Sequence, residues 1–400
     1  MLRSFSWLAV AITQFVALPA LAQISDDMVR IGVLNDQSGQ FAEMAGKGSI
    51  IAARLAAADF GGTVHGKPIE IIAADHQNKP DIGATIARRW FDTEKVDAIV
   101  DVPGSAIALA VQELARTKNR TLLLSGAASS DLTGKACSPL SSQWSDDSYA
   151  MSAGLANAIA RDGGDSWFFI TADYAFGHTL EKDASEAIAK NNGKVLGSVR
   201  HPFATADFAS FLLQAQNSKA KVVALANTAG DTINALKQAS EFGLMQGGQK
   251  VVAMVLFVTD VHSIGLPLAQ GTYLMTSFYW DQNDASRKFA KRFFEANGTM
   301  PTKEHAATYA SVLHYLKAID SVGTDEAGAV NKRMRELPVD YFGHAGHIQP
   351  NGRAVYEVML YRVKSPQDSK YPWDYFKPVQ AVPNELIYRS PDAAGCTTAR

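Results

Sequence analysis

The chain has 400 residues, a formal net charge of −2, 47% hydrophobic residues and 20% charged residues. A chain of this length exceeds what one hydrophobic core normally supports, so we expect two domains. The near-neutral charge, without a run or stripe of Lys and Arg, argues against a protein that binds nucleic acid or an anionic membrane surface.

The first 22 residues have the three parts of a secretory signal peptide. Arg3 supplies the positive charge, residues 7–18 are mostly apolar, and Ala20 and Ala22 form a small-residue cleavage site. The alternative is an uncleaved membrane anchor, but the apolar stretch is shorter than the ~20 residues of a spanning helix. We therefore expect residues 1–22 to be removed and the mature chain to be exported.

Short apolar runs alternate with helical patterns through the first part of the mature chain. Strands are predicted at 29–34, 69–73, 98–102 and 121–124, and helices at 46–60, 81–91 and 106–117. This alternation predicts a parallel sheet with helices on both faces.

The same alternation restarts after Asp147. Helices are predicted at 148–161, 177–191, 208–216 and 232–242, and strands at 166–171, 194–199, 222–227 and 251–258. The chain is therefore α/β, with two doubly wound, Rossmann-like lobes.

The remaining segment is too short for a third domain. It contains a strand at 272–278, helices at 286–297, 305–322 and 326–337, and a strongly β segment at 354–363. We expect the chain to return and complete both lobes. The predicted division is 23–147 with 279–348 for lobe 1, 148–278 with 349–390 for lobe 2, and 391–400 for a tail.

The sequence contains two cysteines, Cys137 and Cys396. In an exported protein an even number favours a disulfide, here one that ties the tail to the first lobe; two free thiols are the alternative. Two distant cysteines do not form a Cys₂His₂ zinc site, and the nine histidines show no HExxH or HxH pattern. No metal is expected.

Catalytic motifs are missing from the sequence. It has neither a GxSxG nucleophile turn nor a GxxxxGK[ST] phosphate loop. Asp260, His262 and Ser263 lie close together, but catalytic triads are assembled from distant segments. Asp146 and Asp147 are expected to complement the dipole of the helix that follows them. We therefore expect neither an enzyme nor a cofactor.

Small hydroxyl residues stand at predicted strand-to-helix junctions. Ser105 follows the strand that ends at residue 102, and Ser125 and Ser129 lie in the loop after residue 124. Ligands of open parallel sheets bind beyond the carboxyl ends of strands, where helix N-termini offer free N–H groups. The serines therefore suit a carboxylate, although simple helix capping would explain Ser105 and Ser129 equally well.

Five segments carry a family resemblance. They are IGVLNDQSGQFAEMAGKGSIIAARLA, ADHQNKPDIGATIARRW, LLSGAASSDLTG, ITADYAFGHTL and ALANTAGDTINALKQASEFGL. In this order they resemble the type I periplasmic solute-binding proteins of ABC importers, in the branch of the leucine/isoleucine/valine-binding proteins. The resemblance implies two lobes joined by three crossovers that close on a ligand as a hinge. It also implies a monomer in the periplasm that delivers the ligand to a permease and ATPase complex.

The resemblance also implies a binding site. Ser105, Ala127 and Ser129 match the positions that hold the ligand carboxylate. Amino-acid binders present an acidic side chain near residues 251–258, but this stretch is apolar here. The other matching or neighbouring positions are Phe41, Met44, Tyr174, Phe176, Thr228 and Phe257. Without a partner a buried ammonium is costly, so we expect a carboxylate with an apolar or aromatic body.

Alternatives remain for the ligand and the role. The pattern QWSDDSYA at 143–150 looks like a subgroup that includes binders of aromatic carboxylates. A branched-chain amino-acid-binding protein of the same importer class is one alternative, and a sensor that presents its bound state to a receptor is another. An exported enzyme on the same scaffold is disfavoured by the missing motifs.

Overall fold

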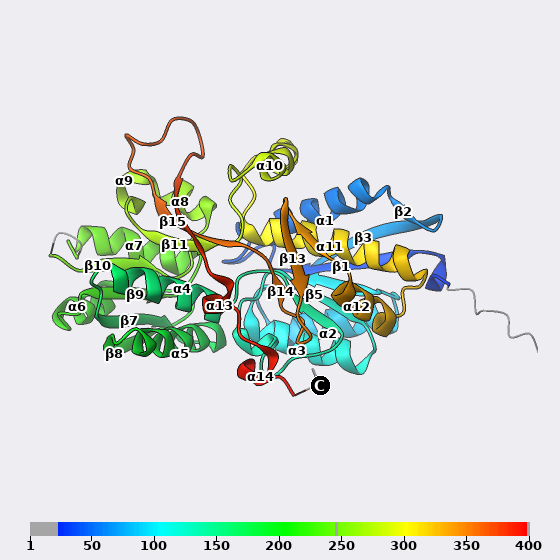
Figure 1. The fold of residues 1–400 in the computed structure, drawn as a ribbon, viewed down its shortest axis with the longest axis horizontal. Coiled ribbons are helices and arrows are strands. Elements are labelled where there is room, and N and C mark those ends of the chain that lie inside the picture. The colour runs from blue at the N-terminus through cyan, green and yellow to red at the C-terminus, as the bar shows by residue number, and fades with distance from the viewer. Residues whose placement is uncertain (1–22, 245–246, 398–400) are drawn as a thin grey trace, which may run out of the picture.

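Two α/β lobes lie side by side along the long axis of the molecule (Figure 1). The computed structural model describes residues 23–244 and 247–397. The expected signal peptide, residues 1–22, lies outside the described residues. Within them, no helix combines the length and the apolar character that crossing a membrane requires.

The first lobe is built on a six-stranded sheet in the order β2-β3-β1-β4-β5-β6. All of its strands pair in parallel except β2, which is antiparallel to β3. The strands are β1 (Val29–Asn35), β2 (Thr63–Val64), β3 (Lys67–Asp75), β4 (Ala98–Asp101), β5 (Thr121–Leu124) and β6 (Ser141–Gln143). The helices are α1 (Gly46–Phe60), α2 (Pro80–Asp92), α3 (Ser105–Thr117), α10 (Asp284–Asn297), α11 (Lys303–Val322) and α12 (Ala327–Glu336), with the short 3₁₀ turns η1 (Ser25–Asp27) and η2 (Ser130–Leu132).

Helices cover both faces of this sheet, which explains why β4 and β5 are apolar runs rather than alternating ones. The helices α1, α10 and α11 form a core on one face, and α2 and α3 form a core on the other. Gly32 of β1 is required for this packing, because a Cβ there would lie 2.4 Å from the Trp90 ring of α2.

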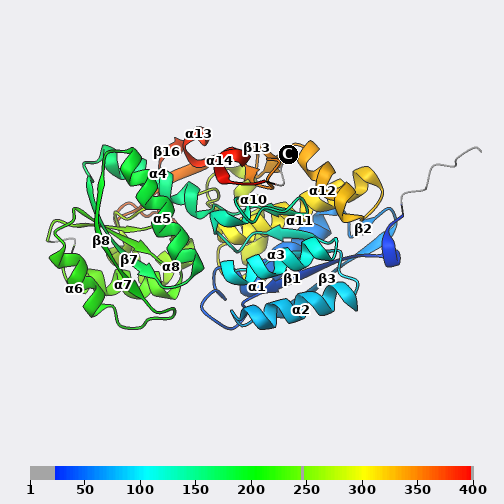
Figure 2. The same cartoon turned by 90° about the horizontal axis from the view of Figure 1, so that it is seen from below.

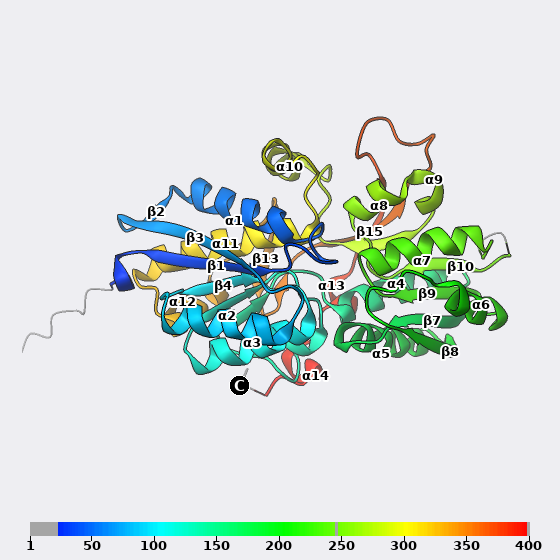
Figure 3. The same cartoon turned by 180° about the vertical axis from the view of Figure 1, so that it is seen from behind.

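The second lobe has a four-stranded parallel sheet in the order β10-β9-β7-β8. Its strands are β7 (Ser166–Ala172), β8 (Lys194–His201), β9 (Val222–Ala226) and β10 (Lys250–Ala253). Its helices are α4 (Ser148–Arg161), α5 (Ala175–Lys190), α6 (Ala209–Asn217), α7 (Gly230–Glu241), α8 (Val258–Ile264) and α9 (Leu266–Ala269). Viewed from behind, both sheets lie between layers of helices (Figure 3).

The strand predicted at 251–258 is shorter in the structure. It ends at Ala253, and residues 254–257 form a loop into α8. The carboxylate of Asp260 accepts the N–H of Phe257 at 2.9 Å, which caps the start of this helix. Asp260 is therefore committed to the backbone of its own helix.

Two small antiparallel sheets complete the lobes. One contains β12 (Val339–Tyr341), β13 (His344–Ile348) and β14 (Ala354–Val355) and packs on the core of the first lobe. The other contains β11 (Tyr273–Thr276), β15 (Val358–Val363) and β16 (Phe376–Val382) and packs on the cores of the second.

The β segment predicted at 354–363 is two strands that belong to different lobes. It breaks at Tyr356 and Glu357, where the chain crosses from β14 to β15. The Tyr356 ring stacks on Tyr341 with 3.8 Å between centroids, which holds the break against the first lobe. The expected lobe boundary at residue 349 is therefore too early, because β14 pairs with β13. The other two crossovers join β6 to α4 and β11 to α10.

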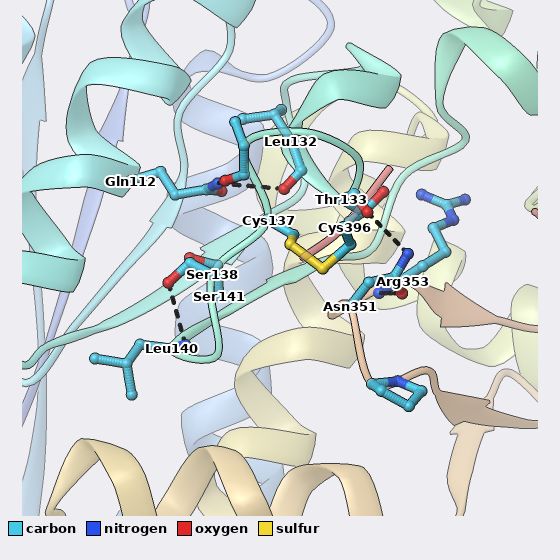
Figure 4. The surroundings of a disulfide bond; sticks show 12 residues. Gln112, Leu132, Thr133, Cys137, Ser138, Leu140, Ser141, Asn351, Arg353 and Cys396 are labelled. Carbon is cyan, nitrogen blue, oxygen red and sulfur yellow. Dashed lines mark hydrogen bonds between the residues drawn. A yellow bond between two sulfur atoms is a disulfide. The ribbon is translucent and has the colours of Figure 1, made fainter. Parts of the chain in front are cut away.

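After β16 the chain returns from the second lobe to the first (Figure 2). We call residues 383–396 the C-terminal strap. Its helix α13 (Asn384–Ile387) packs on α4, while α14 (Pro391–Ala394) lies against Gly134 of the first lobe. Cys396 and Cys137 form a disulfide with 5.6 Å between their Cα atoms (Figure 4). The strap is a fourth connection between the lobes.

We predict that this disulfide stabilises the folded chain substantially. It closes a loop over a sequence separation of 259 residues, for which the chain-entropy model gives an upper value of about 5.6 kcal/mol. Cys137→Ser, Cys396→Ser and the double variant should all unfold at the same lower temperature, because either change alone removes the bond. Mass spectrometry of the non-reduced protein should find no alkylatable thiol, and two alkylated cysteines would contradict the bond.

Candidate functional site

A pocket lies between the lobes, where the carboxyl ends of the two parallel sheets face each other. In the first lobe the strand order reverses between β1 and β4, and in the second between β7 and β9. Such switch points are where open α/β sheets bind ligands. The loops that follow these strands line the pocket, whose accessible volume is about 30 Å³.

The structure brings eight of the nine predicted ligand residues to this pocket. From the first lobe these are Phe41, Met44, Ser105 and Ala127, and from the second lobe Tyr174, Phe176, Thr228 and Phe257. They follow the carboxyl ends of β1, β4, β5, β7, β9 and β10. The rule that ligands bind beyond strand ends therefore located both walls of the pocket.

Ser129 is the exception and does not line the pocket. Its hydroxyl accepts the N–H of Asp131 at 3.3 Å, as the cap of the short turn η2, and lies 3.4 Å from the hydroxyl of Thr179. The side-chain amide of Gln143 donates to the carbonyl oxygens of both Ala127 and Ser129, which fixes the loop in this orientation. The structure therefore shows Ser129 as a cap outside the pocket lining, and contact of Ser129 with ligand stays a prediction.

Helix N-termini from both lobes lie at the pocket. Ser105 is the first residue of α3, and two longer helices, α5 and α11, also begin at the pocket. The partial positive charges of three helix N-termini are therefore near the same space. This arrangement favours a negatively charged group.

Aromatic side chains from both lobes form the apolar side of the site. The Phe41 ring lies 5.7 Å from Phe203, and Tyr174 lies 5.5 Å from Phe203 and 6.1 Å from Phe176. Phe41 comes from the loop after β1, whereas the other three rings come from the second lobe. Carboxylate oxygens of Asp36 accept the N–H groups of Gly39 and Phe41, which positions that loop.

Two charged residues that the sequence reasoning missed also line the pocket. They are Lys303 and Glu304, the first two residues of α11. We expected this helix to begin at residue 305, which left both residues in a loop. In the structure Thr302 caps the helix by accepting the N–H of His305 at 3.3 Å. A threonine three residues before the expected start was the available signal.

Lys303 is buried and paired. Its ammonium lies 3.3 Å from a carboxylate oxygen of Asp146 and 5.8 Å from the centre of the Phe257 ring. Asp146 also accepts the N–H of Ser277. The expectation that Asp146 complements the dipole of α4 is therefore wrong; only Asp147 does so, by accepting the N–H of Ala150 at 2.8 Å.

Glu304 is the acidic residue of the pocket. Its side chain is buried, and its Oε2 has no hydrogen-bond partner among the described residues. Burial raises the pKa of Glu304 from 4.5 to about 8, and the carboxylates of Asp146 and Asp101 reinforce the shift. The sequence of residues 251–258 in the second lobe contains no acidic residue. The acidic residue of the pocket, Glu304, comes from the first lobe instead.

Other buried polar groups support the site without lining it. Ser125 donates to Asp101 and lies 2.7 Å from the hydroxyl of Thr308 on α11. Gly126 lies so close to the end of β4 that a Cβ would be 2.6 Å from Asp101. Within the described residues, His, Cys, Asp and Glu side chains do not gather in threes as a metal ion would need.

Comparisons with known proteins agree with this geometry. The profile of a family described as periplasmic binding protein matches residues 28–370. A crystal structure of a periplasmic binding protein from Burkholderia mallei is 42% identical, with a TM-score of 0.91 over 93% of this chain and 99% of its own. A branched chain amino acid ABC transporter periplasmic ligand-binding protein from Burkholderia xenovorans is 36% identical, with a TM-score of 0.85 over 93% of this chain and 100% of its own.

A structure at lower identity shares the fold. It is an ABC transporter solute-binding protein from R. palustris in complex with benzoate. It is 17% identical to this chain, with a TM-score of 0.82 over 92% of this chain and 99% of its own.

We predict a pH signature for Glu304 in the ligand-free protein. The folded chain holds the Glu304 proton up to about pH 8, whereas the unfolded chain releases it near pH 4.5. Stability from this group is therefore complete below pH 4.5 and is lost as the pH rises towards 8. Glu304→Gln cannot ionise, so its stability relative to wild type should increase with pH, by about 1.4 kcal/mol for each unit of the pKa shift. Thermal unfolding of both proteins across this range measures the effect; a constant difference would contradict it.

Proposed function

We propose that this chain, which belongs to the periplasmic binding protein family, captures a small organic carboxylate between its lobes and delivers it to the permease of an ABC importer. The observation that carries the proposal is the pocket between two facing switch points. Helix N-termini provide a wall for the carboxylate, and aromatic side chains from both lobes provide a wall for the body of the ligand.

Hinge closure is the proposed mechanism of capture. A ligand that contacts both lobes binds the closed state better than the open one, so it shifts the population towards closure. Contacts between the lobes support the closed state directly. Ser130 of the first lobe donates to Asp183 of α5 at 2.8 Å, and the rings of Phe41 and Phe203 meet across the pocket. The two lobes of the binding protein can separate again and release the ligand to the permease.

The carboxylate is assigned to the wall formed by Ser105 and the loop at Ala127. Both residues line the pocket, and the N-terminus of α3 begins at Ser105. Backbone N–H groups at a helix start hold an anion without adding a cation to the site. Ser129 supports this wall indirectly, through the loop that it caps.

The body of the ligand is assigned to the aromatic wall. Phe41, Tyr174 and Phe176 provide flat apolar surfaces, and Met44 and Phe257 add further apolar area. Aromatic and branched aliphatic acids both suit this lining. The Burkholderia xenovorans protein is described as a branched chain amino acid ABC transporter protein and the R. palustris protein is in complex with benzoate, so amino acids and aromatic acids both belong in the ligand screen.

Location and assembly complete the proposal. Residues 1–22 are proposed as a signal peptide that places the mature chain in the periplasm. A monomer is proposed, because the pocket is built from the two lobes of one chain. A sensor role would use the same closure, and neighbouring permease and ATPase genes would favour transport.

We predict that Ser105→Ala weakens carboxylate binding by about 1–3 kcal/mol, the range for a hydrogen bond to a charged group. Ser129→Ala is the matched control, because it removes a serine hydroxyl from a neighbouring loop outside the pocket. It should cost about 1 kcal/mol of stability as a lost cap and leave affinity nearly unchanged. Calorimetric titration and thermal unfolding of both variants test the pair. Equal affinity losses in the two variants would remove the special role of Ser105.

We also predict that leucine binds more weakly than 4-methylpentanoate, which has the same carbon skeleton without the amino group. Glu304, the acidic residue that lines the pocket, is held largely protonated by burial, so the leucine ammonium lacks an ionised partner and its burial should cost several kcal/mol in effective terms. Calorimetry with both ligands, and with benzoate and 4-coumarate, provides the comparison. Tight binding of leucine with no heat from the other acids would establish an amino-acid binder instead.

A further inference from the structure

We infer that Glu304 determines specificity by accepting a hydrogen bond from a neutral hydroxyl group on the ligand, so that the preferred ligand is a hydroxylated carboxylate. This inference rests on the proposed function, because it assigns the second polar group of the same ligand.

The first observation is an unpaired acceptor in the pocket wall. Glu304 is 2% exposed and lines the pocket, and its Oε2 has no hydrogen-bond partner among the described residues. Leaving a buried acceptor unpaired costs about 1–3 kcal/mol. A ligand group that donates to this oxygen recovers that cost at the moment of binding.

The second observation is that most of the neighbouring polar groups are engaged or acidic. The ammonium of Lys303 is held by Asp146, which also accepts the N–H of Ser277. The groups that face Glu304 are Lys303, Asp146, Asp101 and the hydroxyl of Ser145. Asp101 is itself held by the amide of Asn35 and the hydroxyl of Ser125. The Ser145 hydroxyl is the exception, since neither it nor the Oε2 of Glu304 has a hydrogen-bond partner among the described residues. Apart from that hydroxyl, the ligand is the remaining source of a donor for this oxygen.

The charges in the wall select a neutral donor over an ammonium. An ammonium would require an ionised Glu304 as its partner, and burial raises the pKa of this carboxyl to about 8. A hydroxyl donates to the neutral carboxyl without that cost.

Such an arrangement rejects ligands that lack the hydroxyl. A site built to pair with a ligand hydroxyl discriminates strongly against the analogue without it, because the site's own polar group is then left buried and unpaired. Two ligands that differ only by an apolar group are discriminated much less strongly by such a site. The position of the hydroxyl on the ligand is left to the experiment, since several isomers can be compared.

The test uses two matched ligand sets on the full mature protein. One set is benzoate with its 2-, 3- and 4-hydroxy isomers. The other is 4-methylpentanoate, 2-hydroxy-4-methylpentanoate and leucine, which differ only in hydrogen, hydroxyl or ammonium. In the wild type, at least one hydroxylated acid should bind about ten-fold or more tighter than its parent, as expected for one recovered hydrogen bond. Leucine should bind more weakly than the hydroxy acid of its shape.

Two variants separate the role of Glu304 from general damage. Glu304→Leu should erase the preference for the hydroxyl while the parent acid binds at least as tightly as in wild type. Glu304→Gln keeps an acceptor and the side-chain shape, so it should retain part of the preference and covers the case in which the leucine variant does not fold.

The outcomes distinguish this inference from the proposed function. If plain and hydroxylated acids bind equally to wild type, or the preference survives in Glu304→Leu, Glu304 does not read the hydroxyl and the carboxylate proposal stands. Tighter binding of leucine than of the hydroxy acid also overturns the inference. If no carboxylate of either set binds, the proposed function fails and the inference fails with it.

Discussion

The buried contact between Asp146 and Lys303 holds one of the crossovers between the lobes against helix α11 of the first lobe. Asp146 belongs to the crossover from β6 to α4, and the residue whose N–H it accepts, Ser277, belongs to the crossover from β11 to α10. Arg353 donates to the carbonyl of Ser145 and so adds the strand that leads to the third crossover. The hinge axis therefore depends on a compact group of polar contacts. Removing one partner of a buried ion pair is expensive, because the other charge is left in a dry environment.

This hinge also sets the chemistry of the pocket. Lys303 brings a positive charge to the wall, but Asp146 balances it, so an incoming anion does not face an uncompensated lysine. The partial positive charges at the pocket then come from helix N-termini, which are fixed dipoles and need no counterion. Because Lys303 both holds a crossover and lines the pocket, one side chain links the arrangement of the lobes to the pocket wall.

Much of the fold follows from patterns within single elements. The helix α4 spans Ser148–Arg161 as predicted, because its cap Asp147 is visible in the sequence. The strand β5 also agrees with its apolar run. The segment 354–363 could not be divided correctly, because strand propensity is continuous across Tyr356 and Glu357. Only the pairing partners, β13 and β11, assign its halves to different lobes.

The residues of the site could also be predicted only in part from local sequence patterns. Positions after strand ends were predictable, since the topology of a doubly wound sheet brings them together. Lys303 and Asp146 are 157 residues apart, and no periodicity links them. Ser129 was assigned to the correct loop, but a single amide, that of Gln143, decides which side chain of that loop faces the ligand. Long-range contacts between individual side chains are the information that local patterns lack.

The C-terminal strap has a consequence for the order of assembly. Cys396 follows the described strands and helices of both lobes, so the strap reaches Cys137 in its native geometry only when the second lobe has folded and carried the chain back. The bond then adds a covalent constraint to an arrangement that the two folded lobes have already set.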